Sequence, residues 1–254
     1  MLFKEFGDKN APAFIALHGG GLSWWSLRGI IDLLAADYHV IAPVIDGHGE
    51  DAATTFVSIQ DSVRKLIASI DRHLDGKAFA ISGLSIGAQI VIEALSQRPR
   101  LAEYAIIESA SVIPVKAVPV LAAPAYSVFY GVIKSRRFAK MQANALNLPA
   151  EMFDEYYRDS VQMSKESLIN IALSNGSYGL NPDISTTAAR TLILAGGKER
   201  KFMLESARKL RTAIPQSRLC IAENMAHGEL SLRHPDVYVD MIRKFIADNR
   251  SFCR

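Results

Sequence analysis

The stretch "FAISGLSIGAQIVIEAL", residues 79–95, passes from a short apolar run into a longer one, with Gly83 and Gly87 on either side of Ser85. The short run predicts a buried strand and the longer run predicts a helix. A residue that leaves a strand and enters a helix within one turn adopts strained backbone angles, and neighbouring glycines allow that turn to close. The stretch therefore predicts a strand, a sharp turn at Ser85 and a helix.

The rest of the chain repeats this alternation of short and longer apolar runs. The predicted strands are Ala13–Leu17, His39–Pro43, Ala78–Ile81, Tyr104–Ile107, Thr191–Ala195 and Arg218–Ile221. The predicted helices include Leu27–Ala36, Ser58–Leu74, Ala88–Arg98, Leu204–Ala213 and Pro235–Asn249. Strands that alternate with helices predict an α/β fold, in which a mostly parallel sheet carries helices on both faces.

The alternation is interrupted once, because about eighty residues separate the strand ending near Ile107 from the one starting near Thr191. A single crossover needs far fewer residues. We expect residues 1–111 and 186–254 to form the α/β core, and residues 112–185 to be a helical cap inserted between two core strands. The inserted segment also holds most of the tyrosines of the chain. A second small structural domain is the alternative interpretation.

Composition narrows the partners that the protein could have. Charged residues make up 22% of the chain, hydrophobic residues 49%, and the net charge is +3, which is typical of a soluble globular protein and gives no support for nucleic-acid binding. The densest basic cluster, Lys134, Arg136, Arg137 and Lys140, is interpreted as a solvated helix face. The longest apolar stretch, 117–133, contains two prolines and is too short for a clean membrane span. We expect a small-molecule substrate and no stable membrane insertion, and the oligomeric state stays open.

The N-terminus and the two cysteines predict the compartment. The opening residues "MLFKEFGDKN" lack the apolar core of a signal peptide. Cys220 and Cys253 provide neither a disulfide framework nor the spacing of metal ligands, so both are expected to be free thiols. These observations predict a cytoplasmic protein.

The turn at Ser85 has the Gly-x-Ser-x-Gly pattern of a nucleophile elbow, which presents the serine hydroxyl at the carboxyl edge of the sheet. A serine hydroxyl needs a base to become a good nucleophile. His227, in "ENMAHGELS", directly follows the last predicted strand and would lie on a loop at the same edge. The other five histidines are in positions where a structural or surface role is expected, so His227 is the predicted base.

The base in turn needs a carboxylate that fixes its tautomer and stabilises the imidazolium ion. Glu199, in "LILAGGKERKF", lies just beyond the Thr191–Ala195 strand and is the predicted acid. Glu108, at the end of the preceding strand, and Asp183, in the loop returning from the insertion, are the competing acids. Glu199 could also be one charge among several in a surface turn.

The stretch "LHGGGLSWWSL", residues 17–27, would supply a site for an oxyanion. Its glycines expose backbone N–H groups after the first strong strand. We expect the N–H of Ile86 to pair with that of Gly20, or of Gly21. The stretch lacks both phosphate-binding glycine patterns. Trp24 and Trp25 could line an acyl pocket, although at least one is expected to pack the following helix.

Five stretches, "LHGGG", "IAPVIDGHGED", "GLSIG", "LILAGGKE" and "MAHGELSLRHPD", resemble in chain order the α/β-hydrolase superfamily over nearly the whole chain. The resemblance implies an eight-stranded, mostly parallel sheet with a helical cap, a triad of Ser85, Glu199 and His227, and no cofactor or metal. Two departures are the glutamate where the family usually has aspartate, and one short strand before Ala13 where a hairpin is common. The sheet is therefore expected to be one strand short at that edge.

The expected reaction is acyl transfer to water, and hydrolysis of an ester is the reaction that we favour. Hydrolysis of a carbon–carbon bond in a diketone-type substrate is a second possibility. A ligand receptor that keeps the triad but turns over little is the third.

Overall fold

The computed structural model describes residues 1–115 and 117–247. Seven strands in the described residues form one sheet in the order β1-β3-β2-β4-β5-β6-β7. Their bounds are β1 Leu2–Phe6, β2 Ala13–Leu17, β3 His39–Val44, β4 Ala78–Leu84, β5 Ala102–Glu108, β6 Arg190–Gly196 and β7 Ser217–Ala222. All neighbouring strands are parallel except β1, which pairs antiparallel with β3 at the edge. The predicted strands and the missing edge strand are confirmed.

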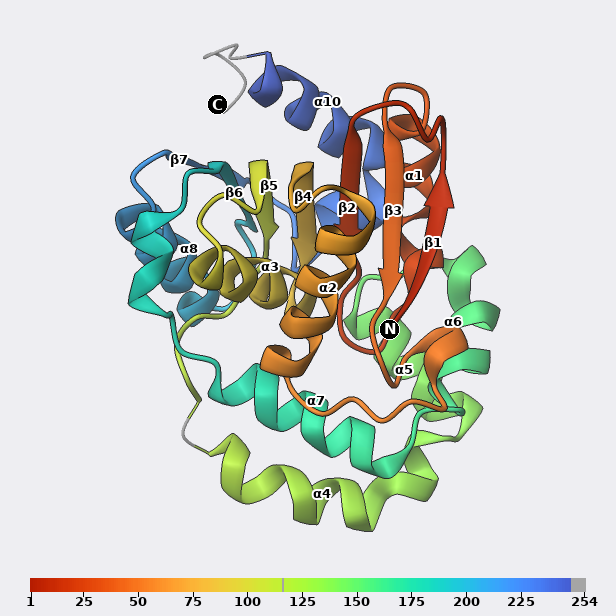
Figure 1. Ribbon diagram of the computed structural model, residues 1–254. Coiled ribbons are helices and arrows are strands. Elements are labelled where there is room, and N and C mark those ends of the chain that lie inside the picture. Colours follow the sequence, from red (N-terminus) through yellow and green to blue (C-terminus); the bar gives the residue numbers. More distant parts are fainter. Residues whose placement is uncertain (116, 248–254) are drawn as a thin grey trace.

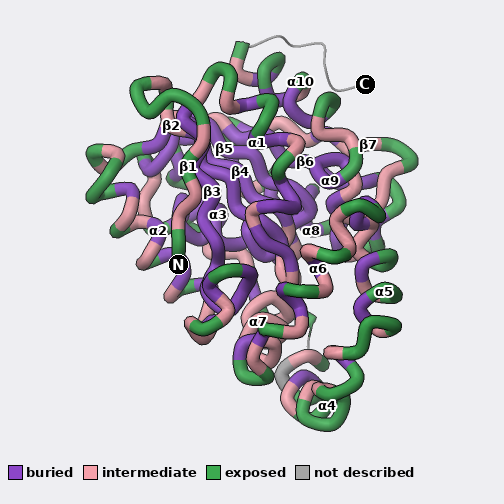
Figure 2. Tube along the Cα trace, turned by 90° about the vertical axis from the view of Figure 1, so that its right-hand side faces the viewer, coloured by how far each residue is buried: buried purple, intermediate pink, exposed green. Residues whose placement is uncertain are grey.

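Helices cover both faces of the sheet (Figure 1). The core helices are α1 Arg28–Leu34, α2 Ile59–His73, α3 Ile86–Gln97, α8 Lys201–Ala213, α9 Glu229–Arg233 and α10 Pro235–Ile246. Alternate residues of β2 belong to two separate clusters: Ile15 and Leu17 pack with α2, α3 and α8, whereas Phe14 and Ala16 pack with α1 and α10. The period-two alternation of side chains along a strand therefore produces one core on each face. Figure 2 shows the sheet as the buried centre of the molecule.

The insertion, residues 112–185, contains the α-helices α4 Val118–Ile133, α5 Arg136–Ala145, α6 Phe153–Ser160 and α7 Lys165–Ser177. These helices lie together at one end of the sheet (Figure 1). Side chains of α7 hold it to the core. Ser167 Oγ accepts a hydrogen bond from Phe56 N–H at 3.1 Å, and Asn170 Nδ2 donates to Phe56 O at 2.9 Å. The division into core and cap stays our interpretation.

Two expectations from the sequence need correction or lie outside the described residues. Cys220 is not a free thiol, so the prediction of a cytoplasmic protein loses that support. Cys253 lies outside the described residues, as does the end of the helix that was predicted to reach Asn249. No helix in the described part of the chain is long and apolar enough to cross a membrane.

Candidate active site

The sheet topology creates a crevice where the chain changes direction across the sheet. After β2 the chain adds β3 on one side and returns to place β4 on the other side. In open parallel sheets, ligands bind beyond the carboxyl ends of the strands at such a switch point. The loop that contains Gly19, Gly20 and Gly21, called the glycine loop below, follows β2. Ser85 follows β4, so the fold brings both to this crevice.

Ser85 has φ 55° and ψ −114°, a strained conformation for a residue with a side chain. A Cβ atom at Gly83 would lie 2.5 Å from backbone atoms of Gly87, and one at Gly87 would lie 2.5 Å from the carbonyl oxygen of His18. Both glycines are therefore required by backbone contacts. The N–H of Ser85 donates to Glu108 O at 2.9 Å, which ties the turn to the neighbouring strand β5.

Glu199 and His227 are in contact, as the sequence predicts. His227 Nδ1 lies 3.0 Å from Glu199 Oε2. The other carboxylate oxygen accepts from Ser109 Oγ at 2.7 Å and from Gly196 N–H at 2.8 Å. Burial alone would raise the pKa of Glu199, but the hydrogen bonds from His227 and Ser109 hold that pKa below its ordinary value. An ionised carboxylate only accepts hydrogen bonds, so Nδ1 carries the proton and leaves Nε2 as the basic nitrogen.

Ser109 is a residue of this site that the sequence analysis missed. It follows Glu108 directly at the end of β5, and its φ is 55°. Besides donating to Glu199, its hydroxyl oxygen accepts from Gly228 N–H at 3.4 Å. It therefore holds both the carboxylate and the residue next to His227. Its place at the carboxyl end of a parallel strand was the one signal that could have revealed it.

The two competing acids, Glu108 and Asp183, do not contact His227 through a hydrogen bond in the described residues. Glu108 is 2% exposed, and its Oε1 accepts from Ser231 N–H at 3.2 Å. Burial raises its pKa to about 7. Asp183 is exposed in the 3-10 turn Pro182–Thr186. Within the described residues, only Glu199 of the three candidates accepts a hydrogen bond from His227.

The glycine loop forms a turn closed by Leu22 N–H and the carbonyl oxygen of Gly19 at 3.2 Å. Gly21 has φ 75°, which a turn of this kind demands at its third residue and glycine supplies. In the described chain, the N–H groups of Gly20 and Gly21 have no acceptor. The N–H of Ile86 opens α3 and has no acceptor four residues earlier. Either glycine could thus pair with Ile86.

A cavity of about 630 Å³ lies between the core and the insertion. Ser85, Glu199, His227, Gly20 and Gly21 line it together. The insertion contributes mainly apolar lining, namely Val115, Val118, Ile133, Ala145, Leu146, Met163, Leu168, Ile171 and Ala172. Ser85 Oγ and His227 share the cavity without a hydrogen bond between them in the described structure.

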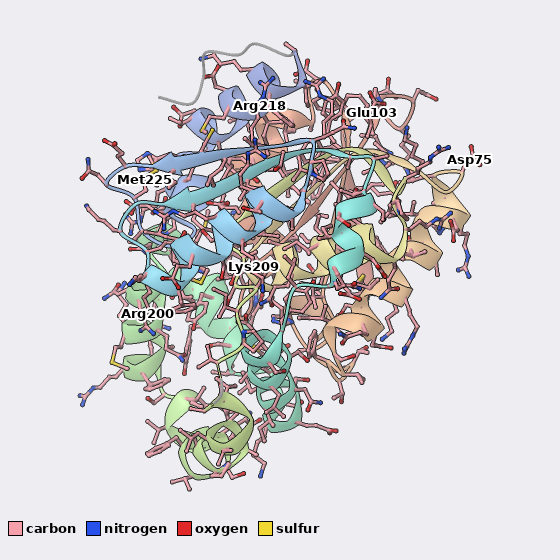
Figure 3. The ribbon with its side chains drawn as sticks, turned by 90° about the vertical axis from the view of Figure 1, so that its left-hand side faces the viewer. Asp75, Glu103, Arg200, Lys209, Arg218 and Met225 are labelled. Carbon is pink, nitrogen blue, oxygen red and sulfur yellow. The ribbon has the colours of Figure 1, made fainter. Side chains whose placement is uncertain are left out.

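Neither tryptophan of the glycine loop lines this cavity. Trp25 is 1% exposed and donates from Nε1 to Asp159 Oδ2 at 2.6 Å, which joins the loop to α6 of the insertion. Trp24 donates to Glu50 Oε1 at 3.3 Å. Trp24, half-buried, packs against the cluster that contains α1, as expected for at least one of the two, whereas Trp25 packs with insertion residues such as Ala139 and Tyr156. The suggestion that they line an acyl pocket is not met in this cavity. In Figure 3, Arg200 and Met225, close in sequence to Glu199 and His227, lie on the same side of the molecule, far from Asp75.

Comparison with known proteins identifies the family and the fold of the chain. The chain is 24% identical to an "AB hydrolase superfamily protein" of Gibberella zeae over 253 residues, which cover 96% of this chain and 83% of the relative. A solved structure from work on carboxylesterases of Nitrososphaera gargenis superposes with a TM-score of 0.79 at 18% identity, covering 97% of this chain and 93% of that one. A meta-cleavage product hydrolase of Pseudomonas fluorescens gives a TM-score of 0.78 at 19% identity, with 97% and 93% covered. Residues 14–241 match the alpha/beta hydrolase family, and the chain belongs to that family.

Proposed function

We propose that this protein is a serine hydrolase that cleaves carboxylic esters of small to medium size. Ser85 is the nucleophile, His227 the general base and acid, and Glu199 the residue that orients and stabilises the imidazole. The N–H groups of Gly20 and Ile86 bind the oxyanion. No cofactor is assigned.

The observation that carries the proposal is that the strained Ser85 and the Glu199–His227 pair line one cavity. Each feature alone has a structural explanation, because turns can be strained and a histidine can hydrogen-bond a carboxylate without taking part in catalysis. Together they support the proposal, because a hydroxyl, an imidazole and a carboxylate lie around one space, beside N–H groups that have no acceptor in the described chain. That combination is what acyl transfer requires.

The reaction proceeds in two halves. Ser85 Oγ attacks the carbonyl carbon while His227 Nε2 takes its proton, and the oxyanion is held by the two N–H groups. The bond from the carbonyl carbon to the alkoxide oxygen then breaks, and His227 gives its proton to the alkoxide, which leaves as an alcohol. The acyl group stays bonded to Ser85 Oγ as the acyl-enzyme. Water attacks the acyl carbonyl, His227 takes one of its protons, and return of that proton to Ser85 releases the carboxylic acid.

The cavity supports small to medium substrates. A volume of about 630 Å³ lies within the usual range for sites that enclose a small molecule. Its apolar side toward the insertion would accept an acyl chain or an aromatic ring. The polar groups there, the hydroxyls of Tyr126 and Tyr156 and the amide of Gln142, could bind one oxygen atom remote from the scissile bond.

The testing experiment combines labelling with a substrate series. Purified protein is incubated with a fluorophosphonate probe and, separately, with p-nitrophenyl esters of increasing chain length, with Ser85→Ala as the matched control. We expect labelling and turnover in the wild type and neither in the variant. Ester turnover that survives in Ser85→Ala contradicts the triad. Labelling without ester turnover directs the search to diketone substrates, and neither labelling nor turnover favours a receptor.

A further inference from the structure

The outer face of α4 is apolar and uncovered. Val120, Leu121, Val128, Phe129 and Val132 are 71%, 60%, 73%, 56% and 50% exposed. They form two adjacent rows along the helix, with the exposed Pro124 and Ala125 completing each row at four-residue spacing. Scattered exposed hydrophobics are normal, but a continuous apolar stripe marks an interaction surface. Figure 2 shows α4 as the outermost element of the insertion, largely exposed.

The inner face of the same helix is already in use. Val118, Tyr126 and Ile133 line the cavity that holds Ser85. Tyr130 OH donates to Met163 O at 3.0 Å, which fixes α4 against the rest of the insertion. A helix that is apolar on all sides is normally buried. The outer stripe is thus left without a partner in the described chain.

Charge indicates which partner fits. From residue 109 to residue 150 the sequence contains five Lys and Arg residues and no Asp or Glu. Lys134 is the C-cap residue that follows α4, and Arg137 and Lys140 lie on α5. In the described chain none of the three has a carboxylate partner. Arg136, by contrast, pairs with Asp154 at 2.6 Å. Figure 2 places α4 and α5 along the same edge of the molecule.

We propose that this face, the exposed rows of α4 with Lys134, Arg137 and Lys140, docks on an anionic lipid surface. Lys134 and Lys140 lie over the rings of Tyr130 and Phe153, at 4.5 and 4.6 Å, but their charges are not neutralised by a carboxylate. An apolar stripe flanked by such cations is the combination that binds at the headgroup level without crossing the bilayer. A second copy of the chain would bring like charges together across the same face, so self-association is disfavoured. The inference is independent of the proposed catalysis.

Vesicle flotation of the Ser85→Ala protein tests it, because this variant cannot consume lipid by the proposed chemistry. The vesicles are phosphatidylcholine alone, or contain about one third phosphatidylserine. Binding should be stronger to the anionic vesicles and should weaken as salt is added. Lys134→Gln, Arg137→Gln and Lys140→Gln should each weaken it about fivefold.

The apolar contribution needs its own variants. Val128→Ser with Phe129→Ser should reduce binding more than about tenfold, whereas Val57→Ser, at a site 57% exposed far along the chain from α4, should leave it unchanged. Thermal unfolding of the same proteins is the folding control. Because neither Val128 nor Phe129 lines the cavity, the same changes made in the protein that retains Ser85 should also leave esterase activity unchanged. A single Phe129→Trp variant should in addition show emission quenched by brominated lipid.

Three results would overturn the proposal. The first is no binding to anionic vesicles by the folded protein. The second is binding that persists in the Val128→Ser, Phe129→Ser protein or in a protein lacking all three cations. The third is concentration-dependent self-association in lipid-free buffer that the same apolar variants abolish, since this would assign the stripe to a second copy.

Discussion

Glu199 Oε2 lies 3.0 Å from His227 Nδ1, and the opposite oxygen of this carboxylate is held by Ser109 and by Gly196 N–H. Three donors therefore converge on one side chain whose own exposure is 0%. A carboxylate fixed in this way cannot rotate to a second partner. Because Glu199 is fixed, its hydrogen bond with Nδ1 also fixes the position of the His227 imidazole.

Glu199→Gln should lower kcat by between about 10²-fold and 10⁴-fold with little change in KM, because an amide can donate to Nδ1 and stabilise the wrong tautomer. Glu199→Asp should keep part of the activity, since its shorter side chain reaches the same nitrogen less well. Steady-state kinetics with one short ester measure both. Glu108→Gln is the matched control and should remain near wild type. If Glu108→Gln were inactive and Glu199→Gln nearly normal, the acid would belong to β5.

Glu108 predicts a pH dependence of stability. Burial raises its folded pKa from the ordinary 4.5 to about 7, against the favourable hydrogen bond from Ser231. The folded chain then holds this proton more tightly than the unfolded chain, so the stability contribution is complete below pH 4.5 and is lost as pH rises through about 7.

Glu108→Gln mimics the protonated form at every pH. At pH 8 it should raise the free energy of unfolding by up to about 3 kcal/mol, and at pH 4 it should change little. Urea unfolding at both pH values measures this. Glu103→Gln, an exposed change on the same strand, is the control. An equal effect at both pH values would mean that the pKa of Glu108 is the same in the folded and the unfolded chain, which would contradict the prediction. His227, Glu199 and Tyr238 also interact electrostatically with Glu108, so the comparison uses identical buffers for all three proteins.

His18 predicts a positioning effect on the oxyanion site. Its Nδ1 donates to Gly19 O at 2.9 Å, while its Nε2 accepts from Ile45 N–H at 3.1 Å. Burial and the neighbouring His48 lower its pKa to about 3, so the ring stays neutral. The Gly19 carbonyl and the Gly20 N–H belong to one planar peptide, so holding the first orients the second.

His18→Ala should therefore reduce kcat by about tenfold or more while KM changes little. His18→Asn should recover part of the loss, because its amide can donate to the same carbonyl. The pH profile above pH 5 should show no step that disappears with His18. The exposed His73→Ala is the control. Equal losses in kcat and thermal stability, with no rescue by Asn, would reduce His18 to a structural role.

The cavity lining predicts the acyl preference. Leu168 of α7 lines the cavity, so Leu168→Ala should move the optimum of the p-nitrophenyl ester series to longer chains, and Leu168→Trp should move it to shorter ones. Val128→Ala, on the outer face of α4, should leave the profile unchanged. These point changes test the cavity lining more specifically than replacing residues 112–185 by a linker would. Removing α7 would also remove the hydrogen bonds that Ser167 and Asn170 make with the backbone of Phe56. An unmoved optimum in both Leu168 variants would show that other residues select the substrate.

Sequence periodicity predicted the core well because its strands are short, apolar and buried on both faces. The prediction of His39–Pro43 and the observed β3, His39–Val44, differ by one residue. The five-residue helix α9 was missed, because "ELSLR" directly follows the histidine loop and is too short to show a helical period. Its glycine N-cap, Gly228, has φ 65° and would place a Cβ 3.1 Å from Leu84, a constraint that only three-dimensional packing reveals.

The candidate active site was predicted from residues that come directly after predicted strands. Ser85, Glu199 and His227 were found in this way, because parallel strands end at one edge of the sheet. The choice of Glu199 over Glu108 could not be decided from spacing, since both residues follow a strand by a few positions at most. The contact between Trp25 and Asp159 was invisible for another reason: 134 residues separate the two, and nothing local marks either one.

The two walls that the insertion gives the cavity are held in different ways. Helix α7 is bonded to core backbone through Ser167 and Asn170, and Gln89 of α3 donates to the carbonyl oxygen of Asn175 at 3.2 Å. The side-chain hydrogen bond of α4, from Tyr130 to Met163, stays within the insertion. If the protein cleaves esters as proposed, we expect substitutions on α7 to change which acyl length is bound, and substitutions on α4 to change how readily the substrate enters. Selection and entry would then evolve separately, through substitutions on two different helices.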